Sequence, residues 1–123
     1  MGGIFFKAKD PKALYEWYRK HLGFEIAPDG SGAMWRDAGH PEIPGCNVFC
    51  IFPRETAYFA PSQSSFMVNF RVDNLNELLQ ALREEGVEVD PKVEDHEYGK
   101  FGWIMDPEGN RIELWEPPKD RWQ

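Results

Sequence analysis

The feature that most constrains the fold of this chain is an internal repeat. Each half carries a short apolar run, then a helix signal, then a glycine that ends the helix. Aligning residues 6–8 (FKA) with residues 70–72 (FRV) gives an offset of 64, whereas aligning Gly23 with Gly86 gives 63. A one-residue slip between the strand and the helix end reconciles the two offsets. A repeat on this scale predicts two copies of one supersecondary unit.

Each half is expected to contain one helix. In the first half Asp10 suits the N-cap, Pro11 suits the first helical position and Gly23 suits the end. In the second half Asn74 suits the N-cap and Gly86 the end. Apolar residues recur between these limits at helical spacing. They are Leu14, Trp17, Tyr18 and Leu22 in the first half, and Leu75, Leu78, Leu79 and Leu82 in the second.

Extended runs surround both helices. Residues 24–27 (FEIA) and 87–90 (VEVD) follow the helices, and two pairs of longer apolar runs come after them. Residues 106–109 (DPEG) predict a turn, because Asp, Pro and Gly suit its first, second and last positions. The sequence therefore predicts one domain over residues 1–123, built from two β-α-β-β-β modules. Module one covers about residues 1–59, a Pro/Ser-rich linker covers 60–65, and module two covers about 66–123.

Charge and hydropathy exclude several classes of partner. The net charge of −7 argues against nucleic acid, which requires a basic surface. No segment approaches the ~20 apolar residues of a membrane span. The first twelve residues have neither the charged region nor the apolar run of a signal peptide. We therefore expect a cytoplasmic protein that binds neither nucleic acid nor a membrane.

Alternation along the expected strands predicts which side chains share the face opposite the helices. The outward positions are uniformly apolar, as a helix-covered face requires. The inward positions combine aromatic bulk with a few polar groups, which is the usual character of a small-molecule pocket. The candidate ligand-binding residues are Phe5, Lys7, Phe49, Met67, Asn69, Trp103, Glu113 and Trp115.

The alternative to a pocket is a second apolar core on this face. Phe5, Phe49, Met67 and Trp115 would fill it. The charged groups on the same face would then need buried partners, because unpaired buried charge is costly. An ion pair of Glu113 with Lys7 or Arg71 would satisfy both interpretations. A solvated sheet face would also explain Glu113 without any function.

Three stretches carry a family resemblance: FFKAKDPKALYEWYRKHLGF, FMVNFRVDNLNELLQALREEGVEV and FGWIMDPEGNRIELWEPP. Together they resemble the glyoxalase/bleomycin-resistance/extradiol-dioxygenase superfamily, also called the vicinal oxygen chelate proteins. The resemblance implies an α+β fold in which two tandem β-α-β-β-β modules form a curled mixed sheet around a cavity. It also implies a second subunit that completes or flanks the cavity, so a homodimer is expected.

The resemblance further implies four positions where metal-dependent members hold a divalent ion. In this chain they fall at Gly3, Phe49, Met67 and Glu113. Glu113 alone among them can bind a hard or borderline cation, because glycine and phenylalanine offer no donor and a thioether is a soft ligand. A register shift of one residue would bring in Phe66, Cys50 or Val48, which does not restore a ligand set. We therefore expect no metal and no other cofactor.

Two functions remain open from the sequence. The first is a metal-independent small-molecule-binding protein of this superfamily, which binds or sequesters an aromatic or charged ligand. The alternative is a lyase, isomerase or dioxygenase of the same superfamily. That enzyme would use either a divalent metal site completed by a partner subunit or Glu113 as its general base. A purely structural domain with a filled cavity is a third interpretation.

Overall fold

The computed structural model describes residues 1–24, 32–37 and 40–119, with side chains described for residues 1–24 and 47–119. Its elements confirm an α+β fold. The strand expected at residues 24–27 lies mostly outside the described residues. In chain order the elements are β1 (Gly3–Ala8), α1 (Pro11–Leu22), β2 (Gly32–Asp37), β3 (His40–Pro53), β4 (Phe66–Arg71), α2 (Leu75–Glu84), β5 (Val89–His96), β6 (Gly99–Met105) and β7 (Arg111–Glu116).

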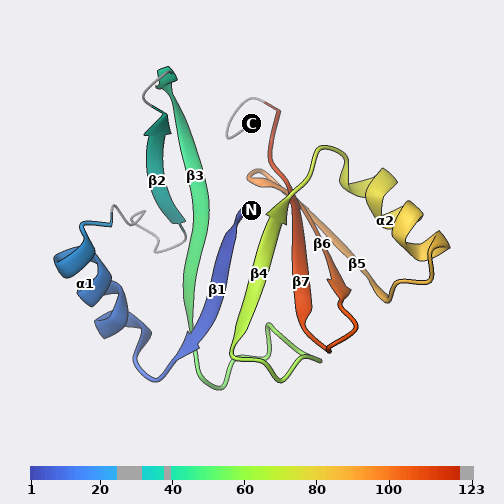
Figure 1. Ribbon diagram of the computed structural model, residues 1–123, viewed down its shortest axis with the longest axis horizontal. Coiled ribbons are helices and arrows are strands. Elements are labelled where there is room, and N and C mark those ends of the chain that lie inside the picture. Colours follow the sequence, from blue (N-terminus) through green and yellow to red (C-terminus); the bar gives the residue numbers. More distant parts are fainter. Residues whose placement is uncertain (25–31, 38–39, 120–123) are drawn as a thin grey trace.

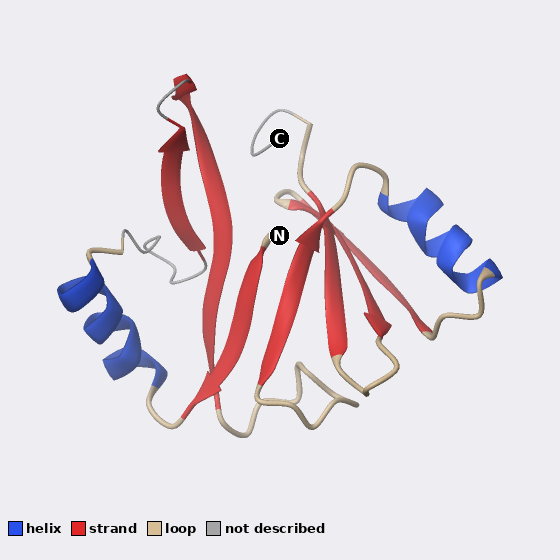
Figure 2. Cartoon of the chain, viewed as in Figure 1, coloured by secondary structure: helices blue, strands red, loops and turns tan. Residues whose placement is uncertain are grey.

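The described strands form one seven-stranded sheet in the order β2-β3-β1-β4-β7-β6-β5. The sheet is mixed, because β1 pairs with β3 and β4 with β7 in parallel, while the other neighbours are antiparallel. The strands fan out side by side into an open, curved sheet, with α1 at one flank and α2 at the other (Figure 1). The long connection between β3 and β4 crosses one end of the sheet as a loop (Figure 2).

The central strands β1 and β4 relate the two halves by an approximate two-fold axis. Gly3 pairs with Asn69 and Phe5 pairs with Met67, on either side of a central pair. That central pair is Ile4 and Val68. The rotation that exchanges the two strands therefore exchanges Gly3 with Met67 and Phe5 with Asn69. This equivalence is the 64-residue offset found in the sequence.

Both helices begin and end where the capping residues predict. The Asp10 side chain accepts a hydrogen bond from the Ala13 N–H (3.1 Å), and Gly23 adopts a left-handed conformation with φ of 69°. The Asn74 side chain accepts from the Glu77 N–H at the same distance. Among the described residues, no helix has both the length and the apolar character needed to cross a membrane.

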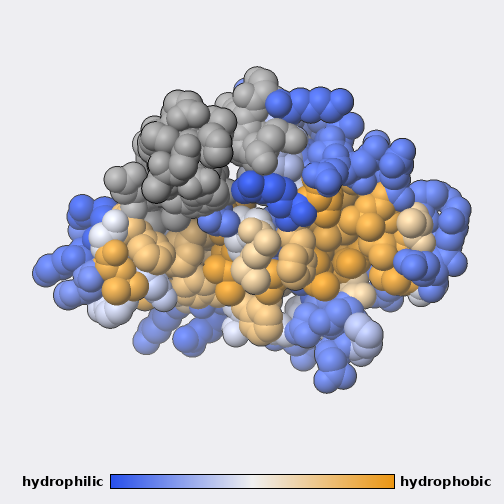
Figure 3. Space-filling view, turned by 45° about the horizontal axis from the view of Figure 1, so that its top comes forward, coloured by the Kyte–Doolittle hydropathy of each residue, from blue (hydrophilic) through white to orange (hydrophobic). Residues whose placement is uncertain are grey.

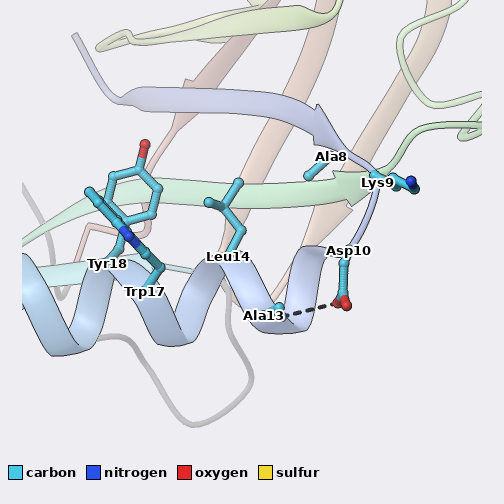
Figure 4. Close-up of a pocket in the computed structure, with 7 residues that line it drawn as sticks. All are labelled: Ala8, Lys9, Asp10, Ala13, Leu14, Trp17 and Tyr18. Atoms are coloured by element: carbon cyan, nitrogen blue, oxygen red, sulfur yellow. Dashed lines mark hydrogen bonds between the residues drawn. The ribbon is translucent and has the colours of Figure 1, made fainter.

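The two helices cover the outer face of the sheet unequally. Leu75 and Leu79 of α2 are fully buried against Leu114 of β7, whereas α1 has no buried residue and leaves Trp17 half-exposed. An open groove of about 510 Å³ runs between β1 and α1 (Figure 4). The face shown in Figure 3 carries a broad apolar band across its middle, bordered by hydrophilic residues. The outer face is thus firmly packed at α2 and loosely packed at α1.

Strand β3 lies one residue away from the register that we expected. Phe5 pairs with Cys50, and Ile4 pairs with Phe49. Because neighbours in register point to the same side of a sheet, Cys50 joins Phe5 on the inner face and Phe49 lies on the helix-covered face. The aromatic rings that Phe49 contacts there are those of Phe6, Tyr15, Tyr18 and Phe24. The prediction that Phe49 lines the inner face is therefore wrong.

The error has a physical reason in the repeat itself. Phe5 pairs with Cys50 as Asn69 pairs with Glu113, so the two-fold axis relates Cys50 to Glu113. That offset is 63 residues, which is the offset between Gly23 and Gly86 and not the offset between the first strands. The one-residue slip seen at the helix ends persists to the last strand of each half.

Replacing Leu79 by Ala should lower the free energy of unfolding by about 2–5 kcal/mol, because it removes a buried side chain and leaves a cavity beneath α2. Urea denaturation measures the change. The matched control is Leu22→Ala in α1, where the side chain is 56% exposed, and the expected change is within about 0.5 kcal/mol. Equal effects of the two substitutions would contradict the unequal packing of the helices.

Candidate functional site

The inner face of the sheet collects most of the predicted site residues in rows. One row runs across four strands through Gly3, Asn69, Glu113 and Trp103, each paired with the next. The next row toward the C-terminal end of β4 contains Arg71, Trp115 and Phe101. Phe5 and Met67 form a pair on the other side of the first row. The alternation predicted for β1, β4 and β7 therefore agrees with the observed register.

The centre of the first row is the Glu113 carboxylate, which is 1% exposed. The Tyr58 hydroxyl donates to its Oε2 atom over 2.6 Å, and the Trp103 indole N–H donates to the same oxygen over 3.0 Å. The Asn69 side-chain amide donates to Oε1 over 2.8 Å. Donors on both oxygens compensate the carboxylate for the water that it loses on burial.

Asn69 is fixed in one orientation by its surroundings. Its nitrogen must face Glu113, since the opposite orientation would set two acceptor oxygens against each other. Its oxygen then points toward Gly2 and has no hydrogen-bond partner among the described residues. A β-carbon on Gly2 would lie 2.0 Å from that oxygen, so only glycine fits there. The backbone at Gly2 therefore packs closely against the Asn69 side chain and helps to hold it in the orientation that bonds Glu113.

Two aromatic residues from the β3–β4 loop close over the row. Phe59 is completely buried and forms an apolar cluster with Phe5, Met67 and Trp103. Tyr58 is half-buried, and its ring stacks on Phe52 with centroids 5.3 Å apart and planes 7° apart. The inner face therefore carries a second apolar core at this end. Of the residues expected for it, Phe5 and Met67 belong to the cluster, while Phe59 and Trp103 stand in place of Phe49 and Trp115.

Charged side chains hold the loop against the sheet. The Lys7 ammonium lies 5.3 Å from the centre of the Phe59 ring, a cation–π contact. The Arg111 guanidinium donates to the Ala60 carbonyl and lies over the Trp103 ring at 5.0 Å. These contacts hold Phe59 and Ala60, so the loop is attached to β1 and β7.

Neither Lys7 nor Arg71, the two candidates for an ion pair with Glu113, stabilises its carboxylate. Lys7 lies over Phe59, and the Arg71 guanidinium lies over the Trp115 ring at 5.3 Å. Neutral donors bind Glu113 instead. Sequence alternation places charges on a face, but it does not determine which loop covers that face.

Burial is the main influence on the pKa values of Glu113 and its hydrogen-bond donor Tyr58. It raises the pKa of Glu113 above the ordinary value of 4.5, against the opposing effect of the hydrogen bonds from Tyr58, Asn69 and Trp103. Burial and the negative charge of Glu113 also raise the pKa of Tyr58 well above its ordinary range. The proton between the two groups therefore belongs to Tyr58, which acts as the donor.

The residues at the family's metal positions do not fit a divalent ion. With the observed register these positions are Gly3, Cys50, Met67 and Glu113. A thiol and one carboxylate fall short of the three protein ligands of a catalytic zinc site. Within the described part of the chain, no group of three or more His, Cys, Asp or Glu side chains is placed to hold a metal. The carboxylate is also already bonded to three protein donors.

The strand pattern did not assign Tyr58 and Phe59 to the site, because they lie at the end of module one, after its last expected strand. The signal that could have found them is the pair of adjacent aromatic residues in TAYFAP, beside a Pro/Ser-rich segment. Large aromatic side chains in a loop tend to pack onto the nearest apolar surface. Here that surface is the inner face of the sheet.

A separate pocket of about 290 Å³ adjoins the cluster at the β5 edge. It opens where β5 departs from its register with β6, between Val89 and Val93. The lining includes Trp103 and Arg111, which also contact Glu113 and the loop respectively. Its volume is at the lower end of the range for ligand pockets, which starts near about 300 Å³.

Comparison with known proteins gives a family match and several structural matches. The sequence model of the Glyoxalase/Bleomycin resistance protein/Dioxygenase superfamily matches residues 4–114. A methylmalonyl-CoA epimerase in complex with methylmalonyl-CoA and NH4+ aligns with a TM-score of 0.67 and 17% identity, covering 100% of this chain and 97% of the other. Methylmalonyl-CoA epimerase from Mycobacterium tuberculosis gives 0.60 and 20%, covering 96% and 87%. A superfamily member from Vibrio splendidus 12B01 gives 0.58 and 16%, covering 93% and 96%. Among curated proteins, no sequence matches this chain.

The raised pKa of Glu113 predicts a specific pH dependence of stability. A raised folded-state pKa contributes stability that is complete below the ordinary value of 4.5 and is lost as the pH rises through the folded-state value. Because glutamine does not titrate, the free energy of unfolding of the wild type minus that of Glu113→Gln should fall across this window. Urea denaturation at intervals from about pH 4 to 8 measures it. A difference that is constant with pH would contradict the raised pKa.

Proposed function

This chain belongs to the Glyoxalase/Bleomycin resistance protein/Dioxygenase superfamily, and we propose that it is a metal-independent protein that binds a small aromatic molecule. One observation carries the proposal. At the family's metal position, the Glu113 carboxylate is bonded to Tyr58, Asn69 and Trp103 instead of facing other metal-ligating side chains. A ligand that took the place of one of these donors would find a hydrogen-bond acceptor in the carboxylate.

The aromatic surroundings of Glu113 support an aromatic ligand. The rings of Phe5, Phe52 and Tyr58 lie within 6.0 Å of one another by centroid distance. Trp103 meets Tyr58 edge-on at 6.3 Å. Planar rings packed in stacked and edge-to-face arrangements favour another planar ring over an aliphatic chain of equal size. A ligand bound here would combine ring contacts with one hydrogen bond to Glu113.

Metal titration tests the proposal. Isothermal titration with Zn²⁺ and Mn²⁺ should show no stoichiometric site that depends on Glu113, because the neighbouring positions supply too few ligands. Weak binding at exposed acidic groups such as Glu94 beside His96 should be identical in wild type and Glu113→Gln. A tight site that is present in the wild type and lost in Glu113→Gln would overturn metal independence.

A ligand screen by thermal unfolding complements the titration. A ligand present at about 100 times its Kd should add about 2.7 kcal/mol to the free energy of unfolding. The proposal predicts that the stabilisation persists when a chelator is added. A stabilisation that the chelator abolishes would favour the metal-dependent alternative.

A second candidate function is proton transfer by Glu113 as a general base. Its support is the raised pKa of the carboxyl, since a base works best with a pKa near the working pH. Similar structures include methylmalonyl-CoA epimerases. Against it stand the hydrogen bonds from Asn69 and Trp103, which reach both oxygens of the carboxylate and lower its pKa, so that Glu113 is a weaker base.

Isotope exchange separates the two candidates. In D2O, a protein that uses Glu113 as a base would incorporate deuterium at the α-carbon of methylmalonyl-CoA, and Glu113→Gln would abolish the incorporation. The binding proposal predicts that mass spectrometry finds no incorporation above a sample without protein. Exchange that requires Glu113 would instead establish the enzymatic function.

A further inference from the structure

Tyr58 sits in the candidate site as a bound phenol would. Its ring stacks on Phe52 and meets the edge of Trp103, and its hydroxyl donates to Glu113 over 2.6 Å. The Tyr58 ring thus has aromatic contacts, and its hydroxyl has a hydrogen-bond acceptor. Each of them is made to a residue of the sheet, on β3, β6 or β7. The slot that holds the Tyr58 side chain is therefore built by the sheet and not by the loop.

The side chain that fills the slot is not the one that anchors the loop in the core. The neighbouring Phe59 is fully buried and anchors the loop among Phe5, Met67 and Trp103. Tyr58 packs against this cluster but is only half-buried. A side-chain rotation of Tyr58 would empty the slot and leave the Phe59 cluster intact.

We propose that the Tyr58 side chain occupies the ligand-binding position when no ligand is bound, and that the natural ligand is a neutral phenol that displaces it. This inference rests on the proposed function and names the ligand class for that site. The ligand would stack on Phe52, present its ring to Trp103, and donate its hydroxyl to Glu113. Tyr58 competes with the ligand for the slot, so the position of the Tyr58 side chain determines the fraction of protein molecules that can bind the ligand.

The chemistry of the slot selects for the hydroxyl. The Glu113 carboxylate is buried, so a hydrocarbon ring in the place of Tyr58 would leave it with one donor fewer and no water to compensate. A site built to hydrogen-bond a substrate hydroxyl discriminates strongly against the analogue that lacks it. An anionic ligand would meet the charge of Glu113 directly, which excludes carboxylates and phosphates from this slot.

The test compares p-cresol, which reproduces the tyrosine side chain, with toluene, which lacks the hydroxyl. Binding is followed by the Trp103 indole N–H signal in two-dimensional NMR spectra, since that group donates to Glu113. In the wild type p-cresol should bind weakly and shift this signal. In Tyr58→Ala it should bind about tenfold tighter or more, because the internal competitor is gone and all molecules are binding-competent. Toluene should bind Tyr58→Ala at least about tenfold more weakly than p-cresol.

Two further variants keep the result interpretable. Tyr58→Phe retains the ring and loses the hydroxyl, so its p-cresol affinity should lie between those of the wild type and Tyr58→Ala even if Tyr58→Ala folds poorly. In Tyr58→Ala combined with Glu113→Gln, the preference for p-cresol over toluene should shrink. If p-cresol binds all variants equally and leaves the Trp103 signal unchanged, the inference is wrong while small-molecule binding elsewhere stands. Equal affinity for toluene and p-cresol in Tyr58→Ala would also overturn it.

Discussion

A carboxylate removed from water must find donors for both of its oxygens, and in this protein that requirement organises one whole face of the sheet. Glu113 is bonded to Asn69 of the neighbouring β4 strand, to Trp103 of the neighbouring β6 strand, and to Tyr58 of the loop above. Each donor is neutral, and burial raises the pKa of the carboxyl above its ordinary value. The covering loop follows from the same need, since without Tyr58 the carboxylate would lose a donor.

The duplicated fold explains why the acceptor lies where it does. Strands β1 and β4 meet at an approximate two-fold axis, and the last strand of each half lies beside one of them in parallel. The axis relates Glu113 to Cys50, Gly3 to Met67 and Phe5 to Asn69. The two halves therefore have the same arrangement of strands but carry different side chains at equivalent positions. The second half carries the buried acceptor and its donor Asn69, and the first half supplies aromatic and sulfur-containing side chains.

Much of this arrangement could be predicted from local patterns. Caps such as Asp10 and Asn74 are readable because each satisfies backbone donors within one turn. Glu113 was recognised because alternation assigns it a face. The error at Phe49 came from applying the 64-residue offset of the first strands to the last strand, where the 63-residue offset of Gly23 and Gly86 holds. Alternation around Phe49 does not reveal the error, since both neighbouring residues are apolar. The positions of Tyr58 and Phe59 depend on how a loop folds across the sheet, which is a long-range contact that sequence periodicity does not contain.

We propose that protein donors, and not a metal, satisfy the Glu113 carboxylate. The most direct measurement is a crystal structure from crystals soaked in Mn²⁺, with anomalous diffraction used to locate the metal. We expect Tyr58, Asn69 and Trp103 to remain within hydrogen-bond distance of the Glu113 oxygens, with no anomalous peak beside them. An anomalous peak in contact with Glu113, with the Tyr58 hydroxyl displaced, would contradict it.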